Sequence, residues 1–140
     1  TTIKDWRKQD GQHIKRGKAT SNICTNESLC VLAAAVYMAL MGKKGLYEVA
    51  RQSTVKSHYL FEKIKQLKGF SPANQAPFFK EFAVKTPRPP QPLIEKMQER
   101  GYFAGVDISP YGYHDHLLIA VTEKRTKDEI DSFIKELQAI

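Results

Sequence analysis

The feature that most constrains the fold is the apolar run LCVLAAAVYMALM at residues 29–41. Its apolar side chains would occupy every face of a helix, and such a helix is normally buried among other elements. We therefore expect a helix enclosed by its neighbours and ended by Gly42, because glycine favours the backbone conformation that terminates helices. The run is shorter than the roughly 20 residues that a membrane-spanning helix needs, and no other apolar run is longer.

A second helix is predicted over residues 45–68 and is expected to end at Gly69. Apolar and small residues recur there at intervals of three and four, which places them on one face of the helix. The residues of that face are Leu46, Val49, Ala50, Ser53, Ser57, Leu60, Ile64 and Leu67. Ser53 and Ser57 are small enough to let a neighbouring segment approach closely.

The second half of the chain alternates short strands with two helices. Residues 78–85 alternate apolar and charged side chains, which predicts a strand with one buried face. The proline cluster at 87–92 cannot continue a central strand, because proline lacks an N–H donor, so we expect a stiff connector into a short helix at 93–100. Two further strand candidates, 102–106 and 116–122, flank a turn-rich loop.

The final helix has the clearest start signal. Thr126 and Glu129 have the spacing of a capping box, and Asp128 places negative charge at the positive end of the helix. An apolar stripe follows, formed by Ile130, Phe133, Ile134 and Leu137. The resulting order, ααβαββα, predicts an α/β fold with a small, mostly antiparallel sheet and helices packed on one side.

An unusual polar loop precedes the apolar run, within QHIKRGKATSNICTN at residues 12–26. Its hydrogen-bonding side chains surround Ile23 and Cys24. They are Thr20, Ser21, Asn22, Thr25 and Asn26. Thr25 or Asn26 can cap the following helix, but one helix start cannot use all five groups. The loop is therefore either an elaborate cap or a surface that meets another domain.

Length and charge indicate how the chain is divided. With 140 residues it fits one domain with its own core, and it carries a formal net charge of +7. More than half of that excess lies in residues 1–18, which we assign to a basic lead-in or inter-domain linker, leaving 19–140 as a single α/β domain. The lead-in could attract nucleic acid non-specifically, but Trp6 is its only aromatic residue, whereas single-strand binders use stacking platforms.

Four parts of the chain resemble, in the expected order, the glycine dehydrogenase (decarboxylating) family, the P-protein of the glycine cleavage system. The resemblance is to the C-terminal end of subunit 1 of the two-subunit form. The matching segments are QHIKRGKATSNICTN at 12–26, GLYEVA at 45–50 with HYLFEKI at 58–64, FFKEFAVK at 78–85 and LLIAVTEKRTKDEID at 117–131. The first and last are long and unusual in composition, and they carry most of the resemblance.

The resemblance implies the small C-terminal domain of a fold-type-I pyridoxal-phosphate enzyme in the cytoplasm. The intact assembly would decarboxylate glycine with pyridoxal phosphate and transfer the aminomethyl group to the lipoylated H protein. Its other implied partners are subunit 2 and the large domain of subunit 1, with no membrane and no specific nucleic acid. The chain alone is expected to be inactive and to hold no cofactor, because the family's cofactor lysine lies outside the matched region.

Arg125 is a candidate substrate-binding residue by analogy alone. In related pyridoxal-phosphate enzymes the small domain commonly supplies an arginine that holds a substrate carboxylate through two parallel hydrogen bonds. The alternative is an exposed charge, or a salt bridge to another domain. The polar side chains at 20–26 are further candidates for lining the cleft, and no residue is assigned a catalytic, cofactor-binding or metal-binding role.

Other chemistry has less support in the sequence. His114 and His116 would lie on the same side of a strand, but a third metal ligand is not evident. Cys24 and Cys30 have neither redox nor zinc-site spacing. A disulfide between them stays open from the sequence, but we expect free and largely buried thiols. Two alternative functions stay open: the small domain of another pyridoxal-phosphate enzyme, such as a cysteine desulfurase, and a basic nucleic-acid-binding module. The segment KATSNICTN argues against the former.

Overall fold

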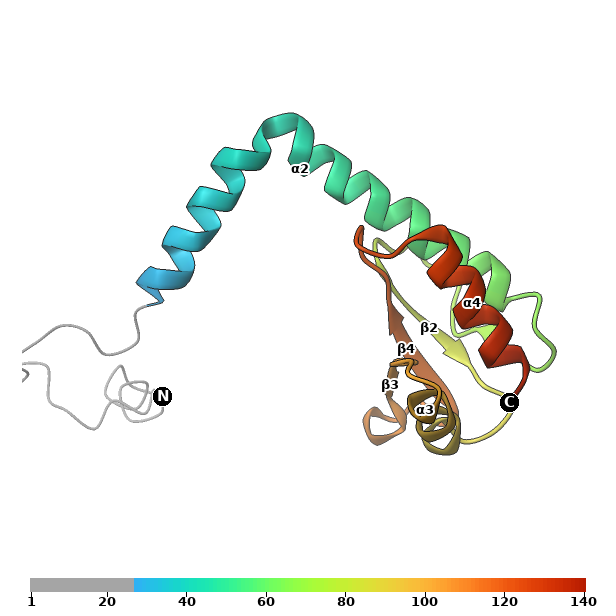
Figure 1. Ribbon diagram of the computed structural model, residues 1–140. Coiled ribbons are helices and arrows are strands. Elements are labelled where there is room, and N and C mark those ends of the chain that lie inside the picture. Colours follow the sequence, from blue (N-terminus) through green and yellow to red (C-terminus); the bar gives the residue numbers. More distant parts are fainter. Residues whose placement is uncertain (1–26) are drawn as a thin grey trace, which may run out of the picture. The chain divides into compact units, whose positions relative to one another are not determined.

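The computed structural model describes residues 27–140 (Figure 1). The chain forms two compact units, of which the first ends at Met41 and the second comprises Gly42–Ile140. The elements in chain order are α2 (Ser28–Ile64), β1 (Ser71–Pro72), β2 (Glu81–Lys85), α3 (Pro90–Glu99), β3 (Val106–Asp107), a 3-10 helix (Ser109–Tyr111), β4 (His116–Ala120) and α4 (Lys127–Gln138).

Helix α2 is two helices joined at Gly42. This glycine has non-helical backbone angles, φ 59° and ψ −176°, which confirms the predicted end of the first helix. Residues 28–41 were expected to be buried, and this expectation is wrong for the described chain. Their large apolar side chains, with exposed fractions from 47 to 81%, are Leu29, Val31, Leu32, Val36, Tyr37, Met38 and Leu40. Composition indicated that this helix needs a cover, and residues 27–140 supply none.

Two further expectations for this helix differ from the structure. Cys30 is free, as expected, but exposed, because it lies on the uncovered helix. By length and composition alone, α2 is also apolar enough to cross a membrane, which sequence inspection had excluded. The helix is interrupted at Gly42, however, and the apolar part before it comprises residues 28–41. At 1.5 Å per residue this part is only about 21 Å long, which is shorter than the hydrocarbon core of a bilayer, about 30 Å.

The sheet is antiparallel throughout and has the strand order β1-β2-β4-β3. Its central pair is β2 and β4, in which Phe82 lies opposite Ile119 and Val84 opposite Leu117. All four side chains are buried, so they form one apolar face of the sheet. The predicted alternation in the first of these strands is therefore confirmed, and the central pair is the base on which the helices pack.

The second part of α2, helix α3 and helix α4 all contribute side chains to one core on this face. Figure 1 shows the second part of α2 and α4 running over the sheet. The buried helical residues are Leu60 and Ile64 from α2, Leu93 and Met97 from α3, and Ile130 and Leu137 from α4. The predicted α/β fold, with helices packed on a small antiparallel sheet, is confirmed.

Several boundaries differ from the sequence-based expectation. Strand β1 was not anticipated; it contains Pro72, which an edge strand tolerates because edge positions do not all need an N–H donor. Helix α3 begins at Pro90, since the fixed φ of proline suits a first helical turn. The second predicted strand, 102–106, shrinks to β3, and residues 102–105 before it are not part of the sheet.

The hydrogen bond between Tyr59 and Asp131 links α2 to α4, with 2.6 Å between the phenolic oxygen and Oδ1. It lowers the pKa of Asp131 and raises the pKa of Tyr59. The lowered carboxyl pKa gives stability that is present above the ordinary aspartate value of about 3.9 and is lost as pH falls through the folded-state value. The raised phenol pKa gives stability that is lost as pH rises above about 10.

We therefore expect Tyr59→Phe to make the chain less stable than the wild type at pH 7. The difference should narrow as pH falls from 7 to 3, because the stability that the lowered pKa of Asp131 gives to the wild type is progressively lost below the ordinary aspartate value. Urea unfolding at pH 7 and at pH 3 measures the difference in the free energy of unfolding between Tyr59→Phe and the wild type. Tyr111→Phe is the matched control, since that side chain is exposed and has no hydrogen bond to a described residue. A stability difference that is equal at both pH values would contradict this assignment.

Candidate functional site

The small residues of α2 allow close contact with two loops. Ser57 Oγ donates to the carbonyl oxygen of Phe79 at 2.8 Å, just before β2. Ser53 Oγ accepts the backbone N–H of Glu123 at 3.1 Å, just after β4. Both serines are buried. The prediction that these positions admit close neighbours is confirmed, and the second contact places α2 against the loop that carries Arg125.

Arg125 lies between a tight turn and the start of α4. Its backbone N–H donates to the carbonyl oxygen of Thr122 at 3.3 Å, which closes the turn. The next residue, Thr126, is the N-cap: Thr126 N–H donates to Glu129 Oε2 at 2.8 Å, and Glu129 N–H donates to Thr126 Oγ1 at 3.2 Å. The predicted capping box is confirmed, and it holds the backbone on the C-terminal side of Arg125.

Arg125 borders a cavity of about 510 Å³ on the surface of the domain. Its walls are mostly apolar and include Tyr102, Phe103 and Phe133. The volume is within the range of small-molecule sites, roughly 300–1,000 Å³. The cavity therefore combines aromatic surface with a cationic group, an arrangement suited to a small anion that also has apolar or planar parts.

Two arginines line this cavity, and they differ in how far they are already engaged. Arg100 Nη1 donates to Glu136 Oε2 at 2.7 Å. Arg125 Nη1 is 3.8 Å from Glu129 Oε1, beyond hydrogen-bond distance, and the Arg125 side chain is 56% exposed. Within residues 27–140 this is the only polar contact of the Arg125 side chain. Most of its N–H donors are therefore available to a ligand or to a carboxylate of another domain.

Glu129 is the acidic group nearest to Arg125 in this cavity. The hydrogen bond from the Thr126 backbone keeps the pKa of Glu129 below its ordinary value. The carboxylate is therefore ionised at neutral pH and partly offsets the charge of Arg125. Because the ion pair is exposed and long, we expect it to contribute little to stability. An arriving carboxylate would compete with Glu129 for the guanidinium.

The other sequence candidates contribute no further site. Thr20, Ser21, Asn22, Thr25 and Asn26 lie outside the described residues, so their role in lining a cleft stays a prediction. His116 Nδ1 is 2.7 Å from the carbonyl oxygen of His114. Within the described part of the chain, no three His, Cys, Asp or Glu side chains gather closely enough to hold a metal ion.

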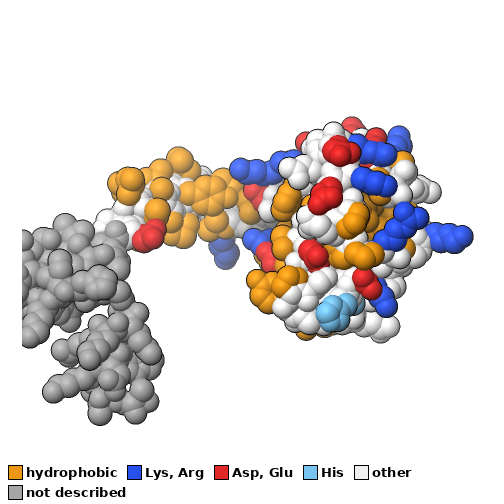
Figure 2. All heavy atoms as spheres, turned by 90° about the horizontal axis from the view of Figure 1, so that it is seen from below, with side chains coloured by type: hydrophobic (Ala, Val, Ile, Leu, Met, Phe, Trp, Pro, Cys, Tyr) orange, Lys and Arg blue, Asp and Glu red, His pale blue; other side chains and the backbone are white. Residues whose placement is uncertain are grey.

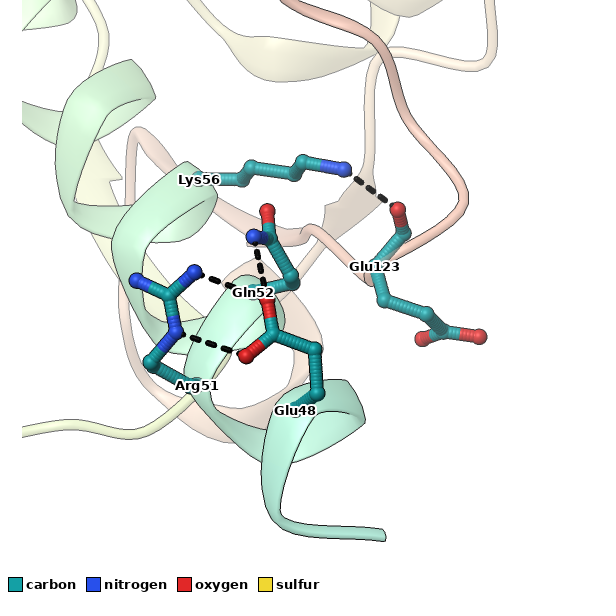
Figure 3. A network of polar contacts seen from close by, with 5 residues as sticks. All are labelled: Glu48, Arg51, Gln52, Lys56 and Glu123. Atoms are coloured by element: carbon teal, nitrogen blue, oxygen red, sulfur yellow. Dashed lines mark hydrogen bonds and ion pairs between the residues drawn. The ribbon is translucent and has the colours of Figure 1, made fainter. Parts of the chain in front are cut away.

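Sequence inspection missed the contacts that Glu123 makes with α2. Lys56 Nζ donates to the carbonyl oxygen of Glu123 at 2.5 Å (Figure 3). About two helical turns earlier on α2, Glu48 accepts hydrogen bonds from Arg51 and Gln52, and these bonds lower the pKa of Glu48 to about 2. The only signal in the sequence was the position of Glu123 directly after a strand, which does not reveal a partner about 70 residues away.

Comparison with known proteins agrees with the resemblance in the sequence. Residues 8–137 match the family model described as glycine cleavage system P-protein. The chain is 56% identical over 129 residues to the probable glycine dehydrogenase (decarboxylating) subunit 1 of Chlorobaculum parvum, and 55% identical to that of Chlorobaculum tepidum. These matches cover 92% of this chain and 29% of each relative, so the chain spans less than a third of their length.

Solved structures show the same relationship. A crystal structure of glycine decarboxylase (P-protein) in inhibitor-bound form aligns with a TM-score of 0.80 and 34% identity, covering 91% of this chain and 29% of that one. A C-DES mutant with glycine covalently linked to its PLP cofactor aligns with a TM-score of 0.62, and its 17% identity indicates a shared fold alone. The expected fold-type-I small domain is thereby confirmed. The chain belongs to the glycine cleavage system P-protein family.

Proposed function

We propose that this chain is a domain of subunit 1 of glycine dehydrogenase (decarboxylating) and acts within the glycine cleavage system. The observation that carries this proposal is the 50–56% identity to eight probable subunits 1. The complete enzyme would decarboxylate glycine in the cytoplasm and pass the aminomethyl group to a lipoylated H protein. Subunit 2 and the remainder of subunit 1 would be its other partners.

Pyridoxal phosphate is the cofactor of this proposed assembly, and it would supply the electron sink for decarboxylation. Such cofactors are held as a Schiff base on a lysine amine. Every lysine among residues 27–140 is exposed or half-buried, so the described residues do not offer an enclosed amine of that kind. We therefore assign this chain the role of a wall of the active-site cleft, with the cofactor held elsewhere in the assembly.

The exposed helix at 28–41 supports membership of a larger protein. A stable soluble protein rarely exposes a large contiguous apolar surface without a binding partner. Figure 2 shows apolar side chains covering this part of α2. Because the relatives are more than three times as long as the matched region, the remainder of the polypeptide is available to cover it.

Arg125 is the residue of this domain that we propose holds the substrate carboxylate. A guanidinium can engage a carboxylate through two parallel hydrogen bonds, and charged hydrogen bonds of this kind contribute about 1.5–3 kcal/mol. Loss of the interaction would lower kcat/KM for glycine by roughly 10- to 100-fold.

The test is a chimaeric subunit 1, in which this chain replaces the matching region of the Chlorobaculum parvum relative. We expect the chimaera to assemble with subunit 2 and to decarboxylate glycine when supplied with lipoylated H protein. Arg125→Gln should then raise KM for glycine. Lys124→Gln is the matched control, since Lys124 is the exposed neighbour and makes no polar contact with a described side chain. An assembled chimaera that never decarboxylates glycine would refute the proposed function.

A further inference from the structure

We propose that Ser53 and Lys56 are positioning residues that hold Arg125 at the substrate-binding cavity. This inference rests on the proposed function, because it concerns the geometry of the same cavity. Neither side chain lines the cavity. Both bind the turn that precedes Arg125, so they would act through that turn and without touching the substrate.

The contacts converge on one residue of the turn. Lys56 Nζ donates to the Glu123 carbonyl oxygen, and Ser53 Oγ accepts the Glu123 N–H at 3.1 Å. Ser53 Oγ also lies 3.4 Å from Glu123 Oε2. Positions 53 and 56 are three apart on α2 and therefore lie on the same face of the helix. One helical face thus binds both backbone polar groups of Glu123, which defines where this residue lies and how its peptide groups are turned.

The turn transmits this constraint to Arg125 over a short distance. Glu123 is a central residue of the turn closed by the hydrogen bond from Arg125 N–H to Thr122 O. On the other side of Arg125, the capping box of Thr126 and Glu129 holds the first turn of α4. The backbone of Arg125 is therefore held from two directions: by α2 through Glu123, and by α4 through its cap.

The contacts from α2 and the cap of α4 differ in what their loss would do to the domain. Loss of the cap weakens a helix and hence the whole core of the second unit. Loss of the contacts from α2 frees a short surface turn, which leaves the core packing of Leu60 and Ile64 in place. A carboxylate-binding guanidinium that moves by about 1 Å loses much of its effect, because catalytic geometry tolerates deviations of only about 0.5 Å. The contacts from α2 should therefore affect substrate binding more than folding.

The experiment uses the chimaeric subunit 1 with subunit 2 and lipoylated H protein. Ser53→Ala and Lys56→Met should each raise KM for glycine about 5- to 10-fold, with kcat changed less than twofold. Lys56→Arg should restore KM to within about twofold of the wild type, because it keeps a cationic donor. Glu48→Gln is the control, since it removes the negative charge that binds Arg51 in the network of Figure 3 and makes no contact with Glu123. KM should stay unchanged in that variant.

A double substitution separates positioning from a general structural effect. In the Arg125→Gln background, Ser53→Ala should raise KM no further, because the residue that it positions is already gone. Inhibition by acetate, a small carboxylate probe, should weaken in parallel with KM. Thermal unfolding shows whether Ser53→Ala folds. If it does not, Lys56→Met, Lys56→Arg and Glu48→Gln test the positioning role without it.

The outcomes distinguish the two proposals. If Arg125→Gln raises KM while Lys56→Met and Ser53→Ala leave it unchanged, the positioning role is wrong and the proposed function stands. If Arg125→Gln has no effect on KM, the carboxylate-binding role of Arg125 fails and the positioning role fails with it. If the α2 variants lose both kcat and stability while KM stays unchanged, the contacts of Ser53 and Lys56 with Glu123 are purely structural.

Discussion

Replacing Gly105 by alanine is expected to lower the free energy of unfolding by about 3 kcal/mol or more, a large part of the stability of a domain of this size. Gly105 has a φ of +140°, which side chains of L-residues rarely adopt. A Cβ atom there would lie 2.4 Å from the backbone oxygen of Leu118 and 3.2 Å from Leu117 Cγ. Backbone strain alone costs about 1–3 kcal/mol, and relief of the clash would require β3 to separate from β4.

Gly112→Ala is the matched control for this prediction. Gly112 also has a positive φ, +89°, but a Cβ atom there meets nothing within 4 Å. We expect this variant to lose only about 1 kcal/mol, the cost of the backbone conformation. Urea unfolding of the 140-residue chain compares the two variants. Equal losses would show that the approach of Gly105 to β4 does not limit stability.

Val36→Asp is expected to lower the glycine decarboxylation activity of the chimaeric enzyme by roughly 100-fold. Val36 belongs to the exposed apolar helix that we propose is covered in the complete protein, and an unpaired charge in such an interface costs several kcal/mol. The same change should leave unfolding of the second unit of the isolated chain within about 0.5 kcal/mol, since an exposed position tolerates it.

Val55→Asp separates the effect of a covered interface from that of a charge on any exposed valine. Val36 and Val55 are 51% and 52% exposed, and both lie in α2, on either side of Gly42. We expect Val55→Asp to retain most of the activity. Assembly with subunit 2 is followed by size-exclusion chromatography. If both variants assemble and remain active, the apolar helix is not the interface that we propose.

Local patterns in the sequence predicted the parts of this domain that depend on neighbours along the chain. The capping box needs only Thr126 and Glu129, three residues apart, and the end of the first helix needs only Gly42. The alternation of Phe82 and Val84 identified a half-buried strand for the same reason, since successive side chains of a strand point to opposite faces. The family resemblance added the class of fold, and the comparisons support it.

The features that local patterns did not predict depend on packing between segments that are distant in the sequence. Strand β1 exists because Ser71 and Pro72 lie beside β2, although two residues that include a proline carry no strand pattern of their own. The contacts from Ser53 and Lys56 to Glu123 join positions about 70 apart, and no periodicity encodes such a pairing. Residues 28–41 show the same limit: composition predicted that this helix is covered, because its apolar side chains point in every direction, whereas residues 27–140 leave it exposed. What covers it depends on tertiary and quaternary contacts, because burial is a property of the surrounding atoms.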